Sequence, residues 1–273
     1  MNASGPADNL FGESAANNGK VKFGAPHWVD FGQELQYHLR TIHVARCICS
    51  SAYIFYIHVV RSRYSPDGKA YIVGHGASDT TSVQAWMLGD EVYLARVSPT
   101  VDAVRDKAQW EFYAGGHGAG AQWVKGDPGK ARPLVSWPHH TGVSTMTYFS
   151  ALRKFILTIS TATVWPSMVG DFDTYFLESD CITGPWRLAN YNARFGSEAY
   201  FCNWPSKFLA KQANTTQRVY DGFLAYSANF ARGISNPPHS GYHLNLQQSR
   251  FKLSENFAAK LERYYSRAEP VHL

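Results

Sequence analysis

Short hydrophobic segments alternate with turn-forming residues along most of this 273-residue chain. The segments are rich in Val, Ile, Phe, Tyr and Trp, and they are bounded by Gly, Pro, Asn and Asp, which is typical of β-strands. An amphipathic period of about 3.6 residues is expected only in a short helix at residues 254–267. The pattern therefore predicts an all-β fold with many turns.

The predicted strands fall into three repeated units. The first strands are expected at residues 25–31, 144–149 and 199–204, the second strands at 69–74, 154–159 and 222–227, and the third strands at 91–96, 173–178 and 241–246. A fourth strand is expected in the first two units, at residues 109–113 and 186–190. Repeats of four short antiparallel strands are typical of β-propeller blades.

Three blades cannot close a propeller ring, which takes about four to eight. Because each blade buries its faces only against its neighbours, we expect the chain to lack one or more N-terminal blades. Residues 1–19 are then a disordered stub, residues 20–253 a partial propeller, and residues 254–273 a short helix and tail. An open three-unit sandwich is the alternative, which would expose apolar end faces.

Residues 37–63 differ from the rest of the chain. They contain no Gly, Pro or acidic residue, and their four Arg account for most of the net charge, which falls from +5 to +1 without them. A genuine insertion is one interpretation, and a metal site at Cys47, Cys49 and His43 is another, but it lacks a second ligand pair at zinc spacing. We favour a segment foreign to the fold, such as a translated intron, because the flanking sequences join into a strand and a tight turn.

Composition excludes several classes of protein. With 45% hydrophobic and only 17% charged residues, the chain can form a core and is not mainly disordered. Four Cys are too few for a disulfide-stapled miniprotein. The longest apolar run, residues 52–60, is shorter than the roughly 18 residues of a membrane span, so no membrane partner is expected. No nucleic-acid partner is expected either, because no basic stripe alternates with aromatic residues.

Residues 142–192 resemble the blades of five-bladed propeller glycosidases of the arabinanase and β-xylosidase type. The resemblance rests on residues 154–160, 175–180 and 182–186, which read as a strand, a Ser-Asp pair and Thr-Gly-Pro-Trp. Gly24 stands where those enzymes carry a catalytic acid before a Pro-His pair. The combination of residues 24–26, 65–71 and 196–201 is more similar to an uncharacterised-domain family of the same architecture, some members of which are endo-D-arabinanases.

The resemblance implies a secreted protein that cleaves or binds a polysaccharide such as an arabinan, although the first residues show no signal peptide. The related enzymes take an essential carboxylate from the first blade, which we expect to be absent. Whether this chain is an enzyme is therefore left open, and the sequence favours no oligomeric state. The alternatives are a non-catalytic glycan-binding propeller, a protein-interaction propeller and a polysaccharide lyase.

Glycoside hydrolysis requires two carboxyl groups, about 5–5.5 Å apart for retention or about 6.5–9.5 Å apart for inversion. The candidate catalytic residues are Glu198 at the start of an inner strand, Asp30 on the first inner strand, and Asp173 at the start of a third strand. The alternative for Glu198 is a solvated charge at the end of a strand. Asp30 could instead make turn or interblade hydrogen bonds, and Asp173 could have a structural role near the rim.

Five further residues are candidates for sugar binding. Three histidines lie near strand entrances or ends, and two tryptophans could stack on sugar rings: His27, His75, His140, Trp28 and Trp204. The histidines could orient substrate, act as the base of a lyase, or bind an axial metal ion, but no pattern supports a metal and no cofactor is expected. Structural imidazoles and packing between blades are the alternatives.

Overall fold

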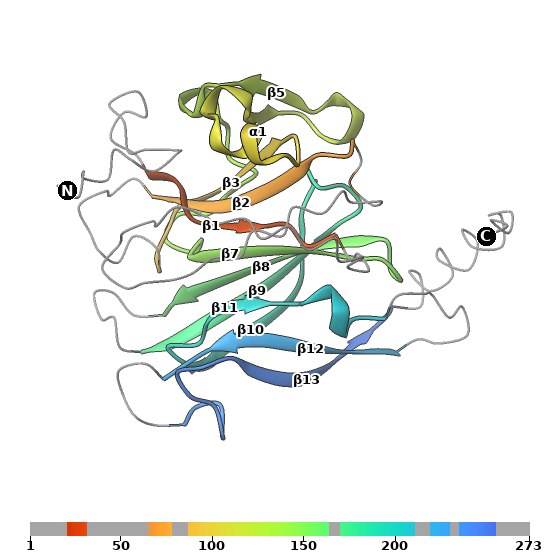
Figure 1. The fold of residues 1–273 in the computed structure, drawn as a ribbon. Coiled ribbons are helices and arrows are strands. Elements are labelled where there is room, and N and C mark those ends of the chain that lie inside the picture. Colours follow the sequence, from red (N-terminus) through yellow and green to blue (C-terminus); the bar gives the residue numbers. More distant parts are fainter. Residues whose placement is uncertain are drawn as a thin grey trace, which may run out of the picture.

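The structure is a computed structural model that describes residues 21–31, 65, 67–77, 87–163, 170–210, 219–229 and 235–254. Within these ranges the fold is all-β, as the sequence predicts, with one short α-helix, α1 (Val101–Arg105) (Figure 1). The expected stub at residues 1–19, the segment at 37–63 and all but the first residue of the expected C-terminal helix lie outside the described residues.

The strands form three antiparallel sheets. The first sheet contains β1 (Val21–Trp28), β2 (Ala70–Ala77), β3 (Glu91–Val97), β4 (Glu111–Gly115) and β5 (Gln122–Lys125), with β6 (Val135–Ser136) also paired to β3. The second contains β7 (Val143–Phe149), β8 (Lys154–Ala162), β9 (Asp171–Ser179) and β10 (Arg187–Ser197). The third contains β11 (Tyr200–Asn203), β12 (Val219–Ser227) and β13 (Asn245–Lys252). Apart from β6, consecutive strands pair within each sheet, and none of these sheets closes on itself.

Each sheet contains the strands of one predicted unit, but the third unit differs in detail. Its last strand was expected at residues 241–246 and instead begins at Asn245. The preceding residues form a turn, because the Asn245 side chain accepts a hydrogen bond from the Gly241 backbone N and donates to the Gly241 and His243 carbonyls. A side chain that satisfies several backbone groups in this way favours a turn over a sheet. The short strands β5 and β6 were not expected.

The second sheet is the middle layer of the three (Figure 1). Leu157 and Leu177 belong to a buried cluster shared with the first sheet, whereas Ile156 and Phe176 belong to a cluster shared with the third sheet. This division follows from the period of two in a strand, which directs neighbouring side chains to opposite faces. Every residue of β8 is consequently buried, and its hydrophobic content on both faces reflects contact with two layers.

The other face of the first sheet is covered by segments that connect its own strands. Phe23, Tyr93 and Phe112 form a buried cluster on this face, and Ala103 and Val104 of α1 pack against it. Among the described residues, no further sheet covers this face of the first sheet, and the third sheet is the layer at the other end of the stack (Figure 1).

Candidate functional site

Glu198 lies at the end of the second sheet where β7 begins. Its side chain is buried, its φ is 51°, and its backbone N donates a hydrogen bond to the Gly170 carbonyl at 2.8 Å. Gly170 directly precedes β9, the first residues of β9 pair with the end of β8, and the end of β8 pairs with the start of β7. A ligand cannot reach this carboxyl group without displacing the atoms that cover it.

Asp30 lies toward the opposite end of β7. It follows β1, forms a parallel bridge with Thr147, and its Oδ2 accepts a hydrogen bond from the Ser206 backbone N at 2.8 Å. Thr147 is four residues beyond Val143, where β7 begins, which corresponds to about 13 Å along a strand. The backbones of Asp30 and Glu198 are therefore anchored at different levels along β7.

Asp173 is the third candidate, and β10 holds its carboxylate in place. One oxygen accepts a hydrogen bond from the Arg194 backbone N at 2.7 Å, and the other accepts one from the Tyr191 hydroxyl at 2.7 Å and a longer one from the Tyr175 hydroxyl at 3.5 Å. Asp173 therefore orients two aromatic side chains.

These tyrosines belong to an aromatic cluster, which we define as Trp137, His140, Tyr175 and Tyr191. The His140 ring stacks on Trp137 at 4.7 Å and 7°, Trp137 contacts Tyr175 at 4.6 Å, and Tyr175 stacks on Tyr191 at 4.7 Å and 11°. Such ring separations are within the favourable range for aromatic pairs. The cluster thus joins the connection after β6 to strands β9 and β10.

The backbone fixes both halves of the aromatic cluster. On one side the Trp137 backbone N donates to the Asp90 carbonyl at 2.8 Å, and the His140 backbone N donates to the Trp137 carbonyl at 3.1 Å. On the other side Tyr191 is the direct cross-strand partner of Tyr175. Cross-strand neighbours on one face contact each other, so the sheet itself holds this pair.

The pKa values of the two tyrosines are both raised. The hydrogen bond to Asp173, followed by burial, raises the pKa of Tyr191, and burial raises the pKa of Tyr175, with Asp173 adding to the effect. Tyr191 as a residue is nevertheless 44% exposed, so part of this oriented and uncharged residue faces solvent. The neighbouring carboxylate can accept hydrogen bonds from a polar ligand.

Sequence reasoning selected Asp173 and His140, and the structure joins them through Tyr175, whose ring lies 6.4 Å from that of His140. Neither Tyr175 nor Tyr191 was a candidate in the sequence analysis. Arg187 on β10 pairs with Glu178 on β9. If the pairing continued regularly from there, Asn190 and not Tyr191 would lie opposite Tyr175. A β-bulge between Leu188 and Asn190 shifts the register by one residue, and a bulge of this kind turns a different side chain toward the neighbour.

The remaining candidate residues lie elsewhere. His27 contacts Phe201 with ring centroids 5.3 Å apart, and His75 is buried within β2. Trp28 packs against Trp110 at 6.0 Å, on the outer side of the first sheet. Trp204 is buried between the second and third sheets. The positions of both tryptophans agree with the packing alternative.

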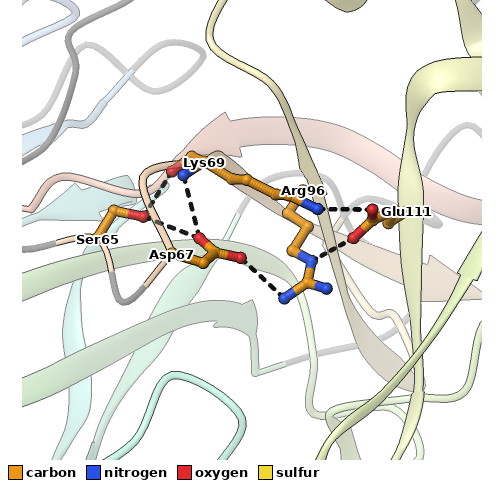
Figure 2. Close-up of polar contacts among 5 residues, drawn as sticks. All are labelled: Ser65, Asp67, Lys69, Arg96 and Glu111. Carbon is orange, nitrogen blue, oxygen red and sulfur yellow. Dashed lines mark hydrogen bonds and ion pairs between the residues drawn. The ribbon is translucent and has the colours of Figure 1, made fainter.

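A network of charged residues ties the turn before β2 to the first sheet (Figure 2). Arg96 donates to Glu111 at 2.6 Å and to Asp67 at 2.9 Å, and Lys69 donates to Glu111 at 2.6 Å. The Arg96 guanidinium also lies 3.9 Å from the Trp123 ring. Because two cations and two anions neutralise each other, we assign this network a structural role.

The described residues contain no group of three His, Cys, Asp or Glu that could hold a metal ion. In the same part of the chain, no helix is long and apolar enough to cross a membrane. The sequence matches no protein-family model, and no curated protein is significantly similar to it. The function therefore has to be inferred from the residues themselves.

Proposed function

We propose that this protein binds a polysaccharide or oligosaccharide at the aromatic cluster. The observation that carries the proposal is Tyr191, a residue that is 44% exposed and whose ring stacks on Tyr175 and is oriented by Asp173. A sugar ring has an apolar face of C–H groups and polar edges of hydroxyl groups. An exposed aromatic ring beside a carboxylate complements both, since the ring covers the apolar face and the carboxylate accepts hydrogen bonds.

The scaffold in this proposal is part of a five-bladed propeller of the glycosidase type. Three antiparallel sheets of consecutive strands that stack face to face support it. The aromatic cluster spans the first and second sheets of this arrangement, so two neighbouring units contribute to one binding surface. A secreted protein that acts on a polysaccharide such as an arabinan accords with this site.

The positions of the carboxylates favour binding over hydrolysis. Glu198 is buried, and Asp30 lies near the far end of β7. A hydrolase needs one carboxylate to protonate the leaving group and another to attack or to activate water. We therefore propose a glycan-binding role for the described residues, related in architecture to glycoside hydrolases.

Substitution of Tyr191 tests this proposal. We expect Tyr191→Ala to weaken binding of arabinan or another soluble polysaccharide by about tenfold or more, because the stacking surface is lost. Tyr191→Phe keeps the ring and loses only the hydrogen bond to Asp173, so its effect should be smaller. Affinity electrophoresis against a panel of polysaccharides, followed by calorimetry with the best ligand, measures both effects.

Leu188→Ala is the matched control, because Leu188 is an exposed apolar residue on the same strand but lies outside the aromatic cluster. It should bind like the unsubstituted protein. Unchanged binding by Tyr191→Ala would reject the aromatic cluster as the site. Failure of the unsubstituted protein to bind any polysaccharide would favour a protein-interaction role, and release of reducing ends would indicate a hydrolase instead.

A further inference from the structure

The outer edge of the third sheet differs from the outer edges of the other two sheets. In the first sheet the outermost strand, β5, has only four residues, and in the second sheet β10 has two register shifts in its pairing with β9. Short strands and bulges both hinder the addition of another strand. In the third sheet the outermost strand is β13, with eight residues.

Strand β13 is regular along its whole length. All eight of its residues pair with β12 in one continuous register, from Asn245 opposite Tyr226 to Lys252 opposite Val219. It contains no Pro or Gly, and among the described residues β12 is its only partner strand. Alternate backbone N–H and C=O groups of a strand point away from its neighbour, so β13 presents a template for a further strand.

Exposed apolar side chains gather on the same sheet. Of the seven large hydrophobic residues that are exposed in the described part of the chain, two are on β10, and the other five belong to the third unit: Val219, Phe223, Tyr242, Leu244 and Leu246. Concentrations of this kind mark interaction surfaces. Leu246 lies on β13, and Tyr242 and Leu244 directly precede it, so these three adjoin the free edge of β13, whereas Val219 and Phe223 lie one strand further in, on β12.

We propose that β13 pairs antiparallel with β13 of a second copy of this chain, joining two third sheets into one continuous sheet. A twofold axis at Gln248 places Gln248 opposite its own copy, and it places Leu246 opposite Arg250 of the partner subunit. Residues that face each other in this register lie on the same side of the sheet, as the period of two requires.

Charge is compatible with this pairing. The two basic residues of β13 are Arg250 and Lys252, and neither lies opposite a basic residue in this register. Arg250 is also neutralised within its own subunit, because its Nε donates to the Asp221 carboxylate on β12 at 2.9 Å. A second copy therefore brings a strand of matching length and regularity without like charges in direct opposition.

Charge substitution at Gln248 tests the pairing. Gln248 is exposed, so a change there should leave the fold intact. We expect the full chain to show a concentration-dependent monomer–dimer equilibrium in sedimentation. Gln248→Lys and Gln248→Glu should each weaken the dimer by about fivefold, because each places two like charges face to face. An equimolar mixture of the two variants should restore dimerisation.

Asn190→Lys is the matched control, since Asn190 is an exposed residue on the bulged edge strand β10. It should dimerise like the unsubstituted chain. A monomer at every concentration would overturn the proposal, and so would a dimer that Gln248→Lys leaves unchanged. If the twofold axis lies at Ser249 instead, Gln248 faces Arg250 of the partner subunit. In that register Gln248→Glu, but not Gln248→Lys, should tighten the dimer, and this outcome would support the pairing of the two β13 strands. Hydrogen exchange of the β13 amides should slow on dimerisation.

Discussion

At the scale of single residues, Cys202 shows how one buried polar side chain connects two layers. It lies on β11 and is fully buried, with its sulfur 3.7 Å from the Thr174 hydroxyl on β9. Its carbonyl accepts a hydrogen bond from the Thr145 hydroxyl on β7 at 2.6 Å. Burial raises the pKa of the Cys202 thiol to about 11, and the hydrogen bonds from Ser160 and Thr174 offset only part of this rise.

This raised pKa predicts a loss of stability in alkali. Above about pH 9 the thiol ionises in the unfolded chain, whereas the folded protein keeps Cys202 protonated until about pH 11, so the free energy of unfolding falls as pH rises through this window. The full effect is on the order of 2–3 kcal/mol. Urea unfolding across this pH range measures it.

Cys202→Ala is the control for the Cys202 prediction. It should lower stability at pH 7 and reduce the slope of stability against pH. Tyr71 and Tyr93, whose pKa values burial also raises, should produce a residual decline at higher pH. An unchanged slope in Cys202→Ala would contradict the assigned cause.

At the scale of elements, ion pairs and bulges set how strands and turns meet. The Arg96 network holds the turn at Asp67 against β3 and β4 (Figure 2). Burial alone would raise the pKa of the Glu111 carboxyl group, but hydrogen bonds from Lys69 and Arg96 outweigh burial and lower it. The Glu111 contribution to stability is therefore present above the carboxyl group's usual pKa and is lost as pH falls through the lowered pKa.

We expect Arg96→Ala to destabilise the protein by about 2 kcal/mol, because it removes the ion pair of partly buried Asp67 and one of the two ion pairs of Glu111, which keeps Lys69. Arg96→Lys should recover only part of this loss, since an ammonium group cannot reproduce the fork of a guanidinium. Urea unfolding at neutral pH measures both variants. Arg187→Ala is the control, because Arg187 pairs with Glu178 at 2.9 Å but is 67% exposed, and it should change stability by less than about 1 kcal/mol. An equal effect of Arg96→Ala and Arg187→Ala would contradict a special role for the network.

At the scale of the whole molecule, the second sheet couples the other two. Leu157 lies at the interface with the first sheet, and Leu224 of the third sheet lies at the interface with the second. Both side chains are almost completely buried. Because β8 contributes to both interfaces, loss of either one exposes the middle layer.

Leu157→Ala and Leu224→Ala should therefore each destabilise the protein by about 3 kcal/mol and lower the midpoint of one common transition. Circular dichroism and tryptophan fluorescence should report coincident unfolding curves for both variants. If Leu224→Ala instead separates the curves into two steps, the third sheet unfolds independently of the rest.

The amino-acid sequence by itself determined the all-β class, the grouping of strands into three sheets and most strand positions. These depend on local properties, namely the alternation of apolar residues and the turn residues between them. The turn before Asn245 escaped prediction because the Asn245 side chain holds it through hydrogen bonds to the Gly241 backbone, at residues whose apolar character favours a strand.

Only the tertiary structure decided the composition of the candidate site. The sequence indicated Asp173 and His140 as separate residues, but a bulge in β10 brings Tyr191 opposite Tyr175, and packing between sheets brings Trp137 beside them. Tertiary structure likewise places Asp30 and Glu198 toward opposite ends of β7. Register shifts and sheet packing arise from contacts between residues distant in sequence, and the local pattern of residues carries no record of them.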